Sequence, residues 1–439
     1  MNQPIDTTPT IRLHVVPVSE TPFQDDLFDT KQLADKLLRT LKLLKDGGAI
    51  AIDSPWGSGK TWFAKNWKLY LDQGGFTTVY VDAFAMDYVD DPFIMIAGEL
   101  LSVAKKLKSN TESSLLEAGA KLGKALLPVG TKVVTSVAAR WLVGEQGAEA
   151  IGNSFDKAVD ELGGLAEKQV EKTLQDYESE KASAFAYKEK IREFASSQKH
   201  PIVVLIDELD RCRPDFAIKT LERIKHFFEV PGVVFVLLVN GKQLAASIRG
   251  AYGSEIDAET YMRKFLIFSV ALPKRRSEYL SNDDLIYCRH ILRAYGFQDK
   301  FVVEKFAEQF GAIASSLRFQ YRDIERGCAL YAIAQPVGSS APLVAWVIAL
   351  KLWRPDLFEG VMHGEHRAHT EIVNLANDTF GNASVVRLAL ELHKDAAKGF
   401  NSNKMSTDDK DSILSMVHSA HKLENVFPML CRKVNLNLR

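Results

Sequence analysis

Eight residues near the N-terminus have the types and the spacing of a phosphate-binding loop. Residues 54–61 read Ser-Pro-Trp-Gly-Ser-Gly-Lys-Thr and lie between an apolar run and a segment with helical periodicity. Glycines let backbone N–H groups turn inward around phosphate oxygens, and the N-terminus of the following helix favours an anion. A lysine and a hydroxyl at the end of the loop can reach the β- and γ-phosphates and hold Mg²⁺. We therefore expect nucleotide binding by Pro55, Trp56, Gly57, Ser58, Gly59, Lys60, Thr61 and Trp62, with Lys60 also acting in catalysis and Thr61 as a metal ligand.

One position departs from the pattern of such loops. The pattern Gly-x-x-x-x-Gly-Lys-Ser/Thr requires glycine at position 54, where this sequence has Ser54. Serine is small, and the order of strand, loop and helix is intact. The prediction of a phosphate-binding loop therefore stands.

A second apolar run ends in acids that would complete a nucleotide site. Residues 202–211 read Ile-Val-Val-Leu-Ile-Asp-Glu-Leu-Asp-Arg. The first carboxylate after such a strand holds Mg²⁺ directly or through water, which is the role expected of Asp207. The adjacent Glu208 can orient and deprotonate the attacking water. A strand ending in acids often only begins a polar loop, but together with the phosphate loop it predicts a site for ATP and Mg²⁺.

Asn240 ends another apolar run, residues 233–239. We expect this run to be a strand between the two strands that carry the motifs, where Asn240 would contact the γ-phosphate or its water. The alternative is that Asn240 only ends the strand in a turn before Gly241. Neither an Asn-Lys-x-Asp guanine motif nor a Leu-Ser-Gly-Gly-Gln signature is present.

Short apolar runs must form the sheet that positions these residues. They span residues 49–53, 77–82, 201–206, 233–239 and 265–272, with helical patterns between them. The last three are continuous, as expected for strands buried on both faces of a parallel sheet. An α/β fold is therefore predicted.

The rest of the chain is expected to be helical. Residues 100–199 read as a helical insertion. Within it, the apolar run 125–143 contains Pro128, Lys132 and Arg140, and charges inside a membrane span are costly. We expect an amphipathic helix there, in solution or in peripheral contact with a membrane, and no transmembrane span. The predicted organisation is an N-terminal strap (1–24), a core in two parts (25–99 and 200–275) around the insertion, a lid-like helical domain (276–340) and a C-terminal helical region (341–439).

Composition excludes some classes of protein. The 439 residues carry 55 Lys and Arg against 56 Asp and Glu, a net charge of −1, so a surface that tracks nucleic acid throughout is not expected. The cysteines are far apart, without zinc spacing, and no secretory signal is visible. These features predict a cytoplasmic protein.

The combined motifs resemble the KAP P-loop NTPases, which belong to the STAND branch of the additional-strand, catalytic-glutamate class. The resemblance is carried by residues 55–61, 81–84 with Asp-Pro following at 91–92, 206–228, 234–253, and 261–266 with Leu-Pro following at 272–273. The most specific part is Asp-Glu-Leu-Asp-Arg-Cys-Arg-Pro from Asp207. It extends over about residues 20–335. Two departures are Glu208, where many members have Asp, and Phe84, where Trp is common. The resemblance implies a five-stranded parallel sheet of 5-1-4-3-2 type and ATP hydrolysis.

The resemblance also directs attention to arginines. Arg322 and Arg326 lie four residues apart in a segment similar to the helical domain that follows the family's core, where an arginine can reach the γ-phosphate and couple hydrolysis to domain rotation. The alternative is a solvated helix face. Arg211 and Arg263 are candidates for acting across a subunit boundary, with surface ion pairing as the alternative.

Two further clusters leave alternatives open. His363, His366 and His369 are spaced by three residues, which suits either a metal site or a polar helix or loop. The run 274–276, Lys-Arg-Arg, would contact nucleic-acid phosphates or cap the end of the sheet.

The residues and the resemblance together predict an ATP-hydrolysing switch that regulates a partner. No nuclease, protease or deaminase motif is evident, so the output is expected from a homo-oligomer, a separate effector protein, or both. The family's phage-exclusion members imply bacterial antiphage defence. The alternatives are an ATP-binding scaffold with negligible turnover and a DNA-dependent ATPase.

Overall fold

The chain forms two compact units that divide between Leu272 and Pro273. The computed structural model describes residues 20–89, 91–126, 166–274, 283–297, 300–334, 341–380, 386–398 and 422–435. In these ranges, the first unit contains a parallel sheet with helices, and the second contains helices and no strand.

The sheet of the first unit has five parallel strands. They are β1 (Gly48–Asp53), β2 (Thr78–Asp82), β3 (Ile202–Asp207), β4 (Val233–Val239) and β5 (Leu266–Val270). Their order is β2-β3-β4-β1-β5, which confirms the predicted 5-1-4-3-2 arrangement read from the other edge. The register pairs Asp53 with Val239 and Asp82 with Asp207. The carboxyl ends of β1, β2, β3 and β4 therefore lie together at one end of the sheet.

Burial differs between the central and the edge strands. Every residue of β3 and β4 is buried, as the continuous apolar runs predict. The same expectation was wrong for β5, whose residues alternate between half-buried and exposed, with Ile267 54% exposed. Because β5 pairs only with β1, it lies at the edge of the sheet, and part of its surface meets solvent.

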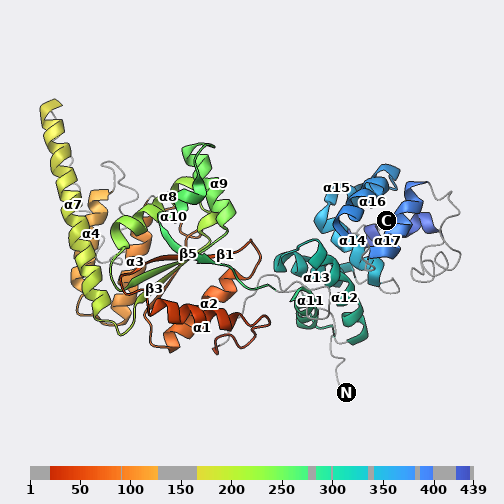
Figure 1. The fold of residues 1–439 in the computed structure, drawn as a ribbon, viewed down its shortest axis with the longest axis horizontal. Coiled ribbons are helices and arrows are strands. Elements are labelled where there is room, and N and C mark those ends of the chain that lie inside the picture. Colours follow the sequence, from red (N-terminus) through yellow and green to blue (C-terminus); the bar gives the residue numbers. More distant parts are fainter. Residues whose placement is uncertain are drawn as a thin grey trace, which may run out of the picture. The chain divides into compact units, whose positions relative to one another are not determined.

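Helices cover both faces of the sheet (Figure 1). On one face, α1 (Thr30–Leu41) and α2 (Lys60–Gln73) pack against alternate residues of β1, β3 and β4, with Trp67 fully buried. On the other, α3 (Pro92–Lys106), α8 (Pro214–Arg223) and α9 (Gly241–Tyr252) bury the remaining alternate residues. This layered packing holds the strand ends, and the loops that follow them, in fixed positions.

The insertion contributes two described helices, α4 (Glu112–Leu126) and α7 (Ala166–Ser196). The fully buried ring of Tyr187 in α7 lies edge-on to Phe93 of α3 and to Phe228, at centroid distances of 5.1 and 5.8 Å. Phe228 ends a π-helical turn, η2 (Ile224–Phe228), that follows α8. The apolar run expected as an amphipathic helix lies outside the described residues from position 127 onward. None of the described helices is long and apolar enough to cross a bilayer.

The described part of the second unit is helical. Its helices are α11 (Asp283–Ala294), α12 (Lys300–Ser316), α13 (Tyr321–Ala334), α14 (Ala341–Trp353), α15 (Pro355–Met362), α16 (His366–Phe380), α17 (Arg387–Ala397), the 3-10 turn η4 (Leu423–Asn425) and α19 (Val426–Val434). Of the basic run, Lys274 forms an ion pair with Asp284 at 2.8 Å, and residues 275 and 276 lie outside the described residues.

The three spaced histidines of the second unit have different surroundings. His363 is exposed after α15, whereas Nδ1 of His366 lies 2.8 Å from a backbone carbonyl of α17. His369 is buried within α16. Within the described residues, no group of three or more His, Cys, Asp or Glu side chains is arranged to hold a metal ion.

His369 belongs instead to a buried chain of hydrogen bonds. Nε2 of His393 accepts from the indole N–H of Trp346 at 2.9 Å, so the neutral ring carries its proton on Nδ1. That nitrogen lies 2.6 Å from Nδ1 of His369 and donates to it. Burial lowers the pKa of His369 to about 4 and that of His393 well below its usual value. Both rings are therefore neutral at pH 7.

Candidate nucleotide-binding site

The phosphate loop connects the end of β1 to the start of α2. Gly57 and Gly59 have φ angles of 76° and 90°, the left-handed region that glycine adopts at low cost. Between them, the buried Oγ of Ser58 makes no hydrogen bond to any of the described residues. A buried hydroxyl without a partner in a glycine-rich turn is what an anion-binding loop would present to a phosphate oxygen.

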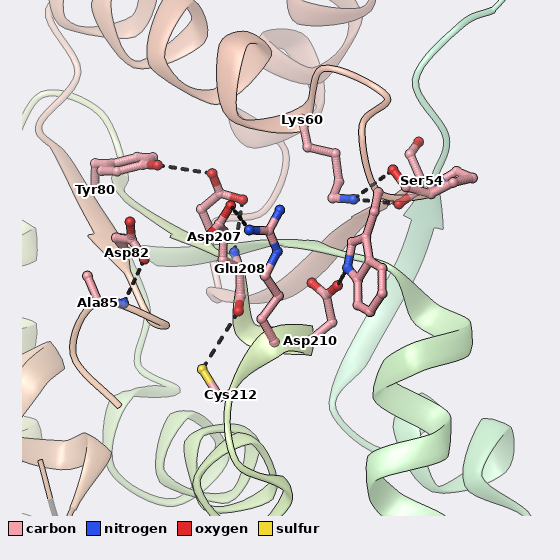
Figure 2. Close-up of polar contacts among 12 residues, drawn as sticks. Ser54, Lys60, Tyr80, Asp82, Ala85, Asp207, Glu208, Asp210 and Cys212 are labelled. Atoms are coloured by element: carbon pink, nitrogen blue, oxygen red, sulfur yellow. Dashed lines mark hydrogen bonds and ion pairs between the residues drawn. The ribbon is translucent and has the colours of Figure 1, made fainter. Parts of the chain in front are cut away.

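Lys60 lies at the first position of α2 and is 8% exposed. Its Nζ donates to the carbonyl oxygens of Ser54 at 2.5 Å and Pro55 at 3.1 Å, two residues of the same loop (Figure 2). Burial lowers the pKa of Lys60, and the nearby carboxylates of Asp210 and Asp207 oppose this shift. The ammonium group is thus positioned inside the loop, where a bound phosphate would stabilise its charge.

Asp207 ends β3 and is fully buried. Its carboxylate accepts from the hydroxyl of Tyr80 at 3.0 Å, from the backbone N–H of Glu208 at 2.9 Å and from the side chain of Thr61. Burial raises the pKa of Asp207, while these hydrogen bonds act in the opposite direction. Thr61 and Asp207, which were predicted from the sequence as metal ligands, are therefore in contact in the structure.

Glu208 lies directly between β3 and the short 3-10 turn η1 (Leu209–Arg211). Its φ of 59° is uncommon for a residue other than glycine. One oxygen of its carboxylate, Oε1, lies 3.0 Å from Nη1 of Arg211. The carboxylate predicted to activate water is thus held in an ion pair within its own turn.

Asp210 and Tyr80 are site residues that the motifs did not reveal. Asp210 is 6% exposed, and its Oδ2 accepts the indole N–H of Trp56, which joins the phosphate loop to η1 (Figure 2). Tyr80 hydrogen bonds to Asp207 from the neighbouring strand. Two sequence features could have indicated these residues if the strand order had been known. They are the Asp-x-x-Asp spacing after β3 and the position of Tyr80 two residues before Asp82.

The loop's departure from the glycine pattern has a structural counterpart. Oγ of Ser54 accepts from the backbone N–H of Leu272 at 2.9 Å. A glycine at this position would have no such acceptor. Ser54 thus links the phosphate loop to the last residue of the first unit.

Asn240 follows β4, which lies between β1 and β3 as expected. The N–H of Gly241, at the start of α9, donates to Oδ1 of Asp53 at 2.7 Å, and Asn240 makes no side-chain cap. Asp53, from the end of β1, therefore caps this helix in place of Asn240.

The other nominated residues are placed as follows. Trp62 belongs to α2, and its indole ring packs edge-on against Phe23 at the margin of the core on that face of the sheet. Arg322 and Arg326 belong to α13 in the second unit, and Arg326 lies 3.9 Å from Asp323. Arg263 ends α10 (Ala258–Arg263) and is exposed.

The model of the KAP family P-loop domain matches residues 30–285, which is more than half of the chain. The chain belongs to the KAP family of P-loop proteins. The matched range includes the phosphate loop, the acids after β3 and Asn240. Residues 30–285 are therefore a nucleotide-binding domain of the P-loop type.

Two solved structures of the Aeropyrum pernix ORC2 protein are similar to this chain at 12% identity, one of the ADPNP-ADP complexes and one of the ADP form. Each alignment covers 97% of this chain and 97% of the ORC2 chain, with TM-scores of 0.34 and 0.36. No curated protein matches the chain.

Proposed function

We propose that this KAP-family chain binds ATP with Mg²⁺, hydrolyses it, and acts as a nucleotide-controlled switch for a partner. The observation that carries the proposal is the convergence of three features at one edge of the sheet. These are a glycine-turned loop with the unpartnered hydroxyl of Ser58, the buried Lys60, and a carboxylate of β3 hydrogen bonded to Thr61.

The phosphate loop supplies the binding energy for the anion. Backbone N–H groups at the start of α2 and the ammonium group of Lys60 neutralise the β- and γ-phosphates. Lys60 now donates to carbonyl oxygens of its own loop and exchanges them for phosphate oxygens. The charge-assisted hydrogen bonds so formed are stronger than those to a neutral carbonyl.

Thr61 and Asp207 would hold Mg²⁺, because a hydroxyl and a carboxylate are oxygen donors of the kind that this ion prefers. The residues present fit the ion, since Asp207 is a buried carboxylate that touches the hydroxyl of Thr61. Tyr80 fixes the orientation of the same carboxylate. When bound, Mg²⁺ neutralises charge on the phosphate oxygens.

Glu208 is the proposed general base, placed directly after Asp207, and orients and deprotonates the attacking water. Asn240, at the end of the neighbouring strand, would hydrogen bond to that water or to the γ-phosphate. Arg322 and Arg326 are proposed to respond to the γ-phosphate from the second unit. This would let hydrolysis change the state of that unit.

The proposed output is regulation of a separate effector protein or of further copies of the chain. The setting implied by the family resemblance is bacterial antiphage defence. Nothing in the balanced charge of the chain favours nucleic acid as the main partner.

The decisive experiment measures ATP binding and phosphate release for the wild type, Lys60→Ala and Glu208→Gln. We expect Lys60→Ala to lose binding by more than about tenfold, because it removes charge-assisted bonds to phosphate. Glu208→Gln should bind ATP but lose turnover. Lys68→Ala, which removes a half-buried lysine paired with Asp72 in the same helix, is the matched control and should behave as the wild type.

Each alternative has its own outcome in this assay. Binding with no release in the wild type would mean an ATP-binding scaffold. Release that depends on added DNA would mean a DNA-dependent ATPase. An unchanged rate in Glu208→Gln would exclude Glu208 as the base.

A further inference from the structure

Arg211 and Glu208 form an ion pair inside the turn that follows β3. Nη1 of the arginine lies 3.0 Å from Oε1 of the glutamate, and the two side chains are 28% and 19% exposed. Figure 2 shows Glu208 next to Asp207. The N–H of Arg211 also donates to the carbonyl oxygen of Glu208, so the local backbone holds the two residues close together.

The backbone fixes Glu208 in this position. Its N–H donates to Asp207 at 2.9 Å, and its carbonyl accepts the N–H of Arg211 at 3.1 Å. Its left-handed φ of 59° carries a conformational cost, which such contacts offset. The carboxylate therefore has few positions available while the ion pair persists.

The turn that carries Arg211 is joined to the phosphate loop. Asp210, the residue before Arg211, accepts the indole N–H of Trp56 in that loop. The guanidinium group of Arg211 therefore belongs to a segment that contacts the loop where an anion would bind. A guanidinium group forms bidentate hydrogen bonds with phosphate oxygens as it does with carboxylate oxygens. A phosphate and a carboxylate therefore compete for the same arginine.

We propose that Arg211 breaks its ion pair with Glu208 when ATP binds and pairs with the γ-phosphate instead. This inference rests on the proposed function. A carboxylate engaged by a guanidinium is a poor acceptor for a proton from water. Transfer of Arg211 to the γ-phosphate would free Glu208 for that proton. ADP, which has no γ-phosphate, would leave the ion pair in place.

The test is a double-mutant cycle read out by binding, with the β,γ-imido analogue of ATP and with ADP as probes. In wild type, the analogue must break the ion pair. Glu208→Gln removes this competition, so we expect affinity for the analogue to rise about threefold to tenfold, while ADP affinity is unchanged. Arg211→Ala should lower analogue affinity, and adding Glu208→Gln to it should have no further effect. Additive effects in the cycle would overturn the proposal.

Three controls keep this result separate from other failures. Arg213→Ala removes another guanidinium of the same segment, paired with Asp87 at 3.1 Å, and should leave the cycle unchanged. Arg211→Lys should bind the analogue more tightly than Arg211→Ala, because it keeps the positive charge. A purely structural role for Arg211 does not predict this difference. If Arg211→Ala fails to fold, Arg211→Gln is used in the same cycle. Absence of ATP binding by wild type would contradict the proposed function itself, whereas normal binding with an additive cycle contradicts only the role of Arg211.

Discussion

The indole N–H of Trp56 donates to the carboxylate of Asp210, so the phosphate loop and the turn after β3 are directly joined. The two residues are 154 positions apart in sequence. We predict that Trp56→Phe destabilises the first unit by about 1–3 kcal/mol, because a buried carboxylate loses a donor. Thermal unfolding measures this loss. Asp210→Asn keeps an acceptor for the indole and should be less destabilising; an equal or larger loss would assign the effect to the charge of Asp210.

Tyr80→Phe should weaken the binding of the Mg²⁺ that supports ATP turnover. The substitution removes the 3.0 Å hydrogen bond that orients the Asp207 carboxylate. We expect the Mg²⁺ concentration for half-maximal activity to rise about tenfold to a hundredfold, which is typical when a metal ligand loses the hydrogen bond that orients it. Tyr70→Phe removes a tyrosine–aspartate hydrogen bond elsewhere in the unit, that to Asp35, and should leave the Mg²⁺ dependence unchanged. A shift of equal size in this control would show that the effect is not specific to Asp207.

Asn240→Ala separates the two interpretations of that residue. Because Asp53 caps α9, we expect the substitution to leave stability nearly unchanged and to slow turnover about tenfold or more through loss of a contact to the reacting groups. Asp53→Ala should show the opposite pattern, with a loss of about 1 kcal/mol from the missing cap. Turnover and melting temperature, measured on both variants, decide between them. Normal turnover in Asn240→Ala would leave Asn240 as a turn residue only.

Acid should destabilise the second unit through its buried histidines. The folded-state pKa of His369 is lowered to about 4, so between the usual histidine value and pH 4 the unfolded chain binds more protons than the folded one. Stability therefore falls as pH falls through this window, by about 2 kcal/mol from His369 between pH 7 and pH 5. Tryptophan fluorescence, to which Trp346 hydrogen bonded to His393 contributes from the second unit, follows denaturant unfolding at the two pH values.

A pair of histidine variants checks the source of that acid sensitivity. His369→Leu should reduce the fall in stability between pH 7 and pH 5, whereas the exposed His363→Leu should not. An undiminished fall in His369→Leu would place the sensitive groups elsewhere.

Local patterns were sufficient to predict the strands and the phosphate loop. Continuous apolar runs mark β3 and β4 because those strands are buried on both faces, and the loop residues are adjacent in sequence. The same rule failed at β5. Its composition is that of a central strand, but its position at the edge of the sheet decides its exposure.

Contacts between distant segments were not predictable from the motifs. Tyr80 reaches Asp207 because β2 and β3 are neighbours with Asp82 opposite Asp207, a register that no single segment encodes. Arg211 was a candidate for acting across a subunit boundary, with ion pairing as the alternative, and it forms an ion pair with Glu208. Roles for Arg322 and Arg326 remain predictions, as does that of Asn240.

The hydrogen bond between Ser54 and Leu272 joins the phosphate loop to the last residue of the first unit. The acceptor belongs to the first residue of the loop, and the donor is the main-chain amide of the residue after which the second unit begins. A loop that rearranges around an anion would therefore tighten or release that amide. Through this serine, which departs from the glycine pattern, occupancy of the site would change a hydrogen bond at the last residue of the first unit.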